Sequence, residues 1–270
     1  MCRWLAYSGP PLLLDELLFK PENSLIRQSM AATQSIVPTN GDGFGLGWYG
    51  KQAYPGIFRD TLPAWNDANL LSLAEQIQSE LFFAHVRAST GTSTSRENCH
   101  PFRLDRVMFM HNGRIGGYGS IRRELEQMIP DKIFRKRSGT TDSEAFFLLA
   151  YGNGLAGDVR KALARTVGQV QDVMEKSGTD EPLRITAAIA DGDRIYALRY
   201  SSDNQSPTLY YGTGGAIQVI DRHVQFSAGD EAVLVLSEPL DAEVGDWIEI
   251  PEGHLLEACG GVVNVTPFRP

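Results

Sequence analysis

Cysteine is scarce in this sequence: Cys2, Cys99 and Cys259 are the three in 270 residues. An odd number of cysteines cannot pair completely into disulfides. The start of the chain also has no small-x-small cleavage site of the kind that ends a secretion signal. We therefore expect reduced thiols and a cytoplasmic protein. Each cysteine then serves either to fill the core or as a reactive group.

Long apolar runs and an excess of positive charge are also lacking. No apolar run approaches the roughly 20 residues that span a bilayer, and 25 Lys and Arg against 33 Asp and Glu give a net charge of −8. Such a chain has no overall field that attracts nucleic acid or anionic lipid. We expect neither a membrane nor nucleic acid as a partner, and a small anionic substrate would need locally placed cations.

The pattern that is present mixes helices and strands. Helical spacing predicts helices over residues 24–31, 68–79, 121–129, 142–151 and 157–176, whereas apolar runs predict strands over residues 3–8, 46–49, 81–86 and 107–110. After residue 180 strand signals dominate, and strands do not alternate with helices as in a parallel βαβ fold. The sequence therefore predicts an α+β fold. No linker rich in Pro, Gly or Ser divides it, so we expect a single domain over residues 1–270.

Cys2 follows the initiator methionine, which is normally removed before a side chain this small. Removal of Met1 would place a free α-amine, of pKa about 7.7–8.0, beside the Cys2 thiol. A thiol of pKa about 8.5 is a strong nucleophile once deprotonated. One residue could thus supply both nucleophile and base. A cysteine at position 2 is by itself more often incidental, so this interpretation depends on the segments below.

Arg87 and several small hydroxyl residues follow the strand predicted over residues 81–86. A guanidinium presents paired donors that match a carboxylate, such as the α-carboxylate of an amino acid. The alternative interpretation is a surface arginine at the end of a strand. The position of Arg87 alone does not distinguish carboxylate binding from a surface arginine.

Asn112 and Gly113 follow a second apolar run, and Asp142 follows two threonines at the start of a predicted helix. The side-chain amide of Asn112 and the N–H of Gly113 could converge on a developing oxyanion. The alternative is an ordinary Asn-Gly turn. Asp142 could accept hydrogen bonds from a substrate ammonium group, and the alternative there is helix capping.

Taken together, these segments resemble the class II (N-terminal nucleophile) glutamine amidotransferase family. The resemblance covers about the first 150 residues, and the matching pieces occur in the family's order: Met1-Cys2-Arg3 and residues 40–45, 85–90, 98–102, 111–113 and 141–144. The chain is most similar to the stand-alone branch, which includes a glutathione-degrading amidotransferase subunit and an ergothioneine-pathway γ-glutamyl hydrolase.

The resemblance implies a four-layer αββα sandwich with two antiparallel sheets face to face, in which residues 180–270 supply the remaining strands. It also implies the site roles: Cys2 is the nucleophile with its α-amine as base, Asn112 and Gly113 form the oxyanion hole, Arg87 binds the α-carboxylate, Asp142 binds the α-amine, and Thr90 lies in the binding loop. One departure is Ala88, where many family members carry an aromatic residue.

The expected activity is hydrolysis of the γ-amide of glutamine or of a γ-glutamyl compound through a glutamyl thioester, without a cofactor. We expect no metal, because Cys99 and His100 have no partner pair at metal-ligand spacing and suit a structural role better. Two alternatives stay open. One is a hydrolase of glutathione-like γ-glutamyl peptides that acts with a separate synthase or peptidase subunit, and the other is a non-catalytic regulatory member of the fold.

Overall fold

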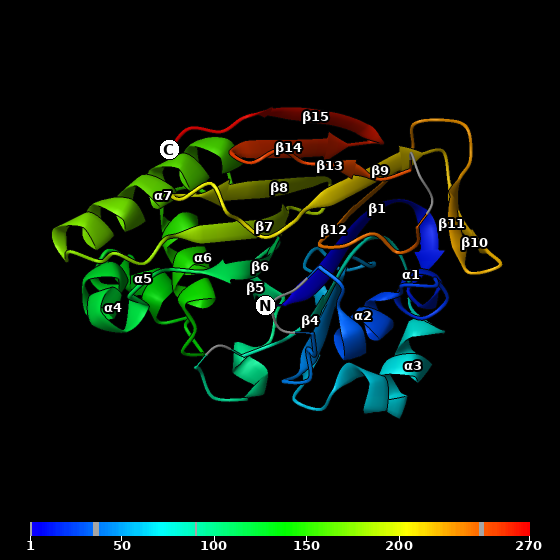
Figure 1. Cartoon of the computed structure of the whole chain (residues 1–270), viewed down its shortest axis with the longest axis horizontal. Coiled ribbons are helices and arrows are strands. Elements are labelled where there is room, and N and C mark those ends of the chain that lie inside the picture. Colours follow the sequence, from blue (N-terminus) through cyan, green and yellow to red (C-terminus); the bar gives the residue numbers. More distant parts are fainter. Residues whose placement is uncertain (1, 35–37, 90, 243–245) are drawn as a thin grey trace.

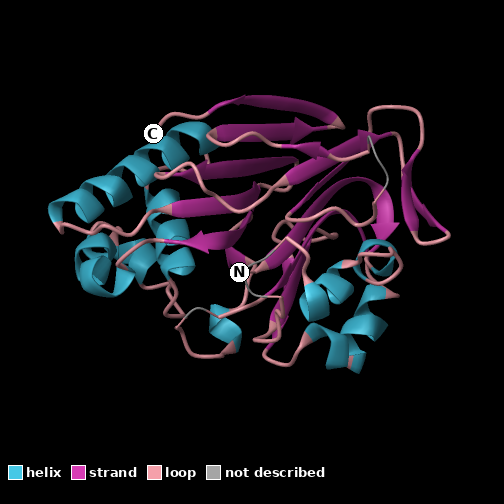
Figure 2. Ribbon diagram, viewed as in Figure 1, coloured by secondary structure: helices cyan, strands magenta, loops and turns pink. Residues whose placement is uncertain are grey.

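Two antiparallel sheets form the centre of the computed structural model, which describes residues 2–34, 38–89, 91–242 and 246–270. Figure 1 shows the elements by label and Figure 2 shows them by type. In the first sheet the described strands run in the order β13 (Ile248–Glu249), β9 (Tyr210–Gly214), β12 (Ala232–Leu236), β1 (Arg3–Leu13), β4 (Gln78–Val86), β2 (Phe44–Trp48) and β3 (Gly56–Asp60). In the second the order is β15 (Val262–Pro267), β14 (His254–Cys259), β8 (Arg194–Ser201), β7 (Arg184–Ala190), β6 (Val107–Arg114) and β5 (Phe102–Leu104).

Helices cover the outer face of each sheet (Figure 1). Beside the first sheet lie α1 (Asp15–Leu18), α2 (Leu25–Ala31), α3 (Ala68–Ala74) and the hairpin of β10 (Ile217–Ile220) with β11 (His223–Phe226). Beside the second lie α4 (Tyr118–Gln127), α5 (Asp131–Phe134), α6 (Asp142–Gly152) and α7 (Val159–Lys176). Two short 3-10 turns, η1 (Ala64–Asn66) and η2 (Arg96–Asn98), complete the described elements.

The alternation of side chains along the strands explains the layers. In β1, Trp4 and Ala6 point into the apolar core between the two sheets, whereas Leu5 and Tyr7 point into the core under the helices of the first sheet. Successive side chains of a strand face opposite ways, so an entirely apolar strand can be buried on both faces. The α+β class and the four-layer αββα sandwich are therefore confirmed.

The helix starts follow their sequence signals. Ser24 caps α2 by accepting a hydrogen bond from the Arg27 N–H, and Thr141 caps α6 by accepting one from the Glu144 N–H. The helix predicted over residues 68–79 is shorter than expected. It ends at Ala74, because Gln78 and Ser79 pair instead with the far end of β1.

Two predicted strands extend further than expected, and one of them carries site residues. The strand predicted over residues 107–110 does not stop at the following polar residues, because β6 continues to Arg114 in register with β7, where Asn112 lies opposite Thr186. The predicted strand at residues 3–8 continues to Leu13 past an irregularity after Ser8. Asn112 therefore lies in a paired strand, and the turn interpretation of Asn112 and Gly113 is wrong.

Candidate active site

The register of β1 fixes the position of Cys2. Arg3 lies opposite Val86 at the end of β4, so Cys2 comes next to the residues that follow β4. Its thiol is half-buried and donates a hydrogen bond to the carbonyl oxygen of Ala88, with an Sγ–O distance of 3.6 Å. Burial raises the pKa of the Cys2 thiol, and the positive charges of Arg87 and Arg3 act in the opposite direction. The thiol is therefore mainly protonated at neutral pH and would need a base to become a nucleophile.

Arg87 lies at the end of β4 and is 3% exposed, so the surface-arginine interpretation is wrong. Its Nη1 donates to the carbonyl of Asp42, and its Nη2 donates to the hydroxyls of Ser89 and Thr92 and to the carbonyl of Ser93. All these acceptors are uncharged. Among the described residues the guanidinium has no ion-pair partner, and Nε makes no hydrogen bond. A buried charge without a counter-ion is costly, so an anionic ligand would be strongly favoured here.

The glycine-rich loop before β2 braces Arg87. The Arg87 N–H donates to the carbonyl of Gly43 at 2.8 Å, and the carboxylate of Asp42 accepts from the Ser89 N–H at 2.7 Å. A Cβ on Gly43 would lie 2.7 Å from both the Cys99 sulfur and the Asp60 carbonyl oxygen. Only glycine therefore allows this close approach.

Asn112 and Gly113 lie together on β6, opposite Thr186 and Ile185. Asn112 is 1% exposed, and its Nδ2 has no hydrogen-bond partner among the described residues. Buried side-chain donors are almost always satisfied, so this amide is poised for a ligand. A Cβ on Gly113 would lie 1.9 Å from the carbonyl oxygen of Arg184, so the backbone passes where only glycine fits.

Asp142 is the first residue of α6 and Thr141 is its N-cap, so Asp142 is not the N-cap of this helix. The Asp142 carboxylate accepts hydrogen bonds from the N–H groups of Ile115 and Ser143, at 2.9 and 2.8 Å. These two hydrogen bonds fix the orientation of the Asp142 carboxylate. Its oxygens keep further lone pairs that can accept hydrogen bonds from a ligand. The hydroxyl of Ser143 also contacts Nδ1 of His111 at 2.8 Å, which links α6 to β6.

One cavity of about 280 Å³ brings these side chains together. Its lining includes Cys2, Arg87, Asn112, Gly113 and Asp142, which are five of the six predicted site residues. The sixth, Thr90, lies outside the described residues. Ala88, the departure from the family pattern, also lines the cavity, so its methyl group forms part of the wall.

Sequence reasoning missed several residues of the lining. Ser143 and His111 sit inside the recognised motifs, and their position there was the available signal. Arg184 starts β7, about 70 residues beyond Asn112, and nothing in the sequence pointed to it. His100 was expected to be structural, but its side chain also lines the cavity. Burial lowers the pKa of His85, a neighbour of His100 behind the cavity, to about 3.

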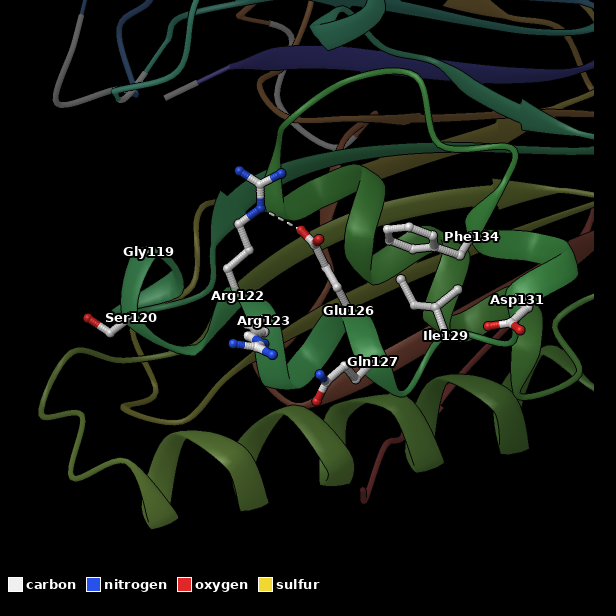
Figure 3. Close-up of a pocket in the computed structure, with 9 residues that line it drawn as sticks. All are labelled: Gly119, Ser120, Arg122, Arg123, Glu126, Gln127, Ile129, Asp131 and Phe134. Atoms are coloured by element: carbon white, nitrogen blue, oxygen red, sulfur yellow. Dashed lines mark hydrogen bonds and ion pairs between the residues drawn. The ribbon is translucent and has the colours of Figure 1, made fainter.

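A larger hollow of about 620 Å³ lies elsewhere, over α4 and α5 (Figure 3). It contains none of the residues predicted for the site, and its Arg122 is engaged with Glu126 at 2.6 Å. The smaller cavity is therefore the candidate site, because it is lined by Cys2 and by Asn112 and His100, whose side chains have nitrogens without a hydrogen-bond partner among the described residues. In the described part of the chain, no three His, Cys, Asp or Glu side chains are placed to hold a metal ion. None of the described helices is long and apolar enough to cross a membrane.

Comparison with known proteins identifies a family. The family model described as "Glutamine amidotransferases class-II" matches residues 23–269. A probable glutamine amidotransferase of Saccharomyces cerevisiae is 34% identical over 95% of this chain and 81% of its own length. The gamma-glutamyl-hercynylcysteine sulfoxide hydrolase of Mycolicibacterium smegmatis is 27% identical over 99% of this chain and all of its own.

Solved structures show the same fold. A class-II glutamine aminotransferase domain protein from Silicibacter pomeroyi superposes with a TM-score of 0.74 at 33% identity, over 99% of this chain and all of the other. The glutamine phosphoribosylpyrophosphate amidotransferase of B. subtilis matches with a TM-score of 0.66 at 15% identity, over 98% of this chain and 49% of the other. At that identity the second match supports the fold alone.

Proposed function

We propose that this chain, which belongs to the class II glutamine amidotransferase family, hydrolyses the γ-amide of glutamine or of a γ-glutamyl compound with Cys2 as its nucleophile. The observation that carries the proposal is the convergence on one cavity of a thiol, a buried guanidinium and a buried amide donor. Among the described residues the guanidinium has no ion-pair partner and the amide donor has no hydrogen-bond partner. Each of these groups lacks the partner that a bound γ-glutamyl group would supply.

The substrate's amino-acid end would be held by opposite charges. Arg87 binds the α-carboxylate through donors that no described acid engages, and Asp142 binds the α-ammonium group. Because the protein carries a net charge of −8, an anionic group requires a local cation, and Arg87 supplies one in the cavity. Arg114 and Arg184 also line the cavity, but each forms an ion pair, with Glu181 and Asp203. The two contacts fix the substrate at one end and leave its γ-carbonyl for Cys2.

Removal of Met1 supplies the base. In the proposed mechanism the free α-amine of Cys2 takes the thiol proton while sulfur attacks the γ-carbonyl carbon, forming a C–S bond. The carbonyl oxygen becomes an oxyanion, which accepts hydrogen bonds from Asn112 Nδ2 and the Gly113 N–H. The tetrahedral intermediate collapses, the C–N bond breaks, and the α-ammonium of Cys2 gives its proton to the leaving ammonia or amine.

The second half of the reaction returns the enzyme to its starting state. Water adds to the glutamyl thioester, the α-amine accepts its proton, and the same two donors hold the second oxyanion. The C–S bond then breaks, glutamate leaves, and the thiol recovers its proton. Because burial raises the pKa of the Cys2 thiol, this mechanism depends on the amine and not on a spontaneously formed thiolate.

A cavity of about 280 Å³ suits a γ-glutamyl group, whereas most of a large leaving group would have to extend out of it. The second candidate substrate class is therefore a γ-glutamyl peptide, cleaved with a separate synthase or peptidase subunit as partner. The observation in its favour is the likeness over the whole chain to a hydrolase named for a γ-glutamyl compound.

Both sheets combine strands from the first 150 residues with strands from residues 180–270. This mixing supports the assignment of residues 1–270 to one catalytic domain. The three cysteines are unpaired, which supports a reducing compartment such as the cytoplasm.

The deciding experiment measures glutamate and ammonia release from glutamine, and glutamate release from glutathione, on protein whose N-terminus has been checked by intact mass. Glutamate release from either compound by protein that lacks Met1 supports the proposal. No release from either compound after confirmed Met1 removal would favour the non-catalytic alternative.

A further inference from the structure

His100 has a buried imidazole ring that makes no hydrogen bond to any described residue. Its side chain is 4% exposed, and neither Nδ1 nor Nε2 has a partner among the described residues. Buried polar groups are rarely left in this state, and the exceptions need an explanation. The ring also lines the cavity that contains Cys2, so the missing partner can be supplied by a ligand.

The surroundings of His100 hold its ring in one place. The ring of His85 lies 4.3 Å away and that of Phe102 lies 4.5 Å away, measured between ring centroids. The backbone is equally confined, because a Cβ on Gly45 would lie 2.1 Å from the carbonyl oxygen of His100. A group fixed in this way loses little freedom when it binds a ligand.

His100 and Arg87 are held by the same loop. Nη2 of Arg87 donates to the carbonyl of Ser93 at 3.3 Å, and Nδ2 of Asn98 donates to the same oxygen at 2.9 Å. Asn98 precedes His100 by two residues. The loop of residues 93–100 therefore both supplies an acceptor for the Arg87 guanidinium and carries the His100 imidazole. Burial lowers the pKa of His100 well below its usual value, and the neighbouring His85, His111 and Arg87 act in the same direction. The neutral ring offers one donor and one acceptor.

We propose that His100 donates a hydrogen bond to the α-carboxylate of the substrate, beside Arg87, and so makes a free α-carboxylate a requirement of the site. This inference rests on the proposed function. The other polar groups of a γ-glutamyl substrate already have binding groups in the cavity, namely Asp142 for the ammonium and Asn112 with Gly113 for the γ-carbonyl oxygen. A carboxylate has about four acceptor positions, more than the remaining donors of Arg87 occupy. A neutral donor fills one of them without placing a second positive charge beside the guanidinium.

The test compares three variants by calorimetric binding of L-glutamate and of isoglutamine, whose α-carboxylate is an amide. His100→Phe keeps an aromatic ring but removes both nitrogens, and His100→Gln restores a donor. His85→Phe is the matched control, because His85 is a buried neighbour that is not part of the cavity lining. We expect His100→Phe to weaken L-glutamate binding about tenfold or more. His100→Gln should recover part of this loss, and His85→Phe should bind L-glutamate like the unaltered protein.

The remaining readouts separate binding from packing. We expect His100→Phe to leave isoglutamine binding as it is in the unaltered protein, weak or undetectable, and to keep or raise the thermal midpoint, because it removes two unsatisfied buried atoms. Unchanged L-glutamate affinity in His100→Phe, or an equal loss in His85→Phe, would overturn the role of His100 and leave the proposed function standing. If the unaltered protein with Met1 removed bound neither glutamate nor glutamine, both proposals would fall.

Discussion

Arg3 and Glu238 form an ion pair in which Nε and Oε2 are 3.2 Å apart and the side chains are 0% and 1% exposed. The Arg3 guanidinium also donates to the carbonyl oxygen of Cys2 at 3.0 Å, and Glu238 accepts from the backbone N–H groups of Thr33 and Gln34. The position of Cys2 is therefore fixed by the residue after it. Removal of Met1 would leave this anchor intact.

Substitution of the proposed nucleophile tests the reaction directly. Cys2→Ala should reduce glutamate release to background and leave the thermal midpoint unchanged, because the thiol is half-buried and makes a single weak hydrogen bond. Cys259→Ala, at an exposed free cysteine, is the matched control and should keep full activity. Turnover that survives in Cys2→Ala would remove Cys2 from the mechanism.

Asn112→Asp replaces the proposed oxyanion donor by an acceptor of nearly the same shape. We expect kcat to fall by about 10²–10³, with a much smaller change in KM, because the donor acts mainly in the transition state. Asn264→Asp, on the exposed edge strand β15, is the control and should behave like the unaltered enzyme. A purely KM effect in steady-state kinetics would assign Asn112 to ground-state binding instead.

Arg87→Lys keeps the positive charge but loses the planar donor fork. We expect KM for glutamine to rise about tenfold or more while kcat changes little. Arg106→Lys, which alters an exposed ion pair with Asp193, controls for the loss of a guanidinium. If KM stayed the same in Arg87→Lys, Arg87 would not bind the α-carboxylate.

Gly113→Ala should damage both the fold and the activity. The added methyl group would lie 1.9 Å from the carbonyl oxygen of Arg184, which forces β6 and β7 apart at the proposed oxyanion donor. We expect a lower thermal midpoint and a large loss of kcat. Gly168→Ala, within α7 and with nothing within 4 Å of the new methyl group, should instead stabilise the protein by about 0.5–1 kcal/mol. Equal midpoints for the two variants would contradict the steric argument.

The buried histidines predict acid sensitivity. Burial lowers the pKa of His85 from 6.5 to about 3, and it also lowers the pKa values of His100 and His111. In the unfolded chain these rings take up protons near pH 6.5, so the unfolded state binds more protons below that pH. Stability is therefore complete above about pH 6.5 and should fall as the pH is lowered toward 3.

Denaturant unfolding at several pH values measures this slope. His85→Phe removes one of the titrating groups and should make the fall in the free energy of unfolding shallower between pH 6.5 and 3. A slope that is the same in His85→Phe and in the unaltered protein would show that His85 does not contribute to it.

The site residues differ in how far the sequence could identify them. Cys2, Arg87, Asn112, Gly113 and Asp142 stand in short motifs, each of which has an ordinary structural alternative. The order of these motifs along the chain, which resembles one family, was what nominated them together. His100 was misjudged because a histidine beside a cysteine and a proline has no local pattern that separates a core ring from a cavity wall. Arg184 carried no signal, because only the pairing of β6 with β7 brings it to the cavity.

The same division holds for the fold. The sequence by itself determined the α+β class, the helix start at the threonines before Asp142, and the apolar strands, because these follow from patterns of residues close in the chain. Only the tertiary structure decided that β6 runs through Asn112 and Gly113 and that these side chains share one cavity with Cys2. It also decided that Arg87 is buried with no counter-ion among the described residues. Strand register and burial depend on contacts between segments far apart in sequence. These contacts form only when both sheets assemble.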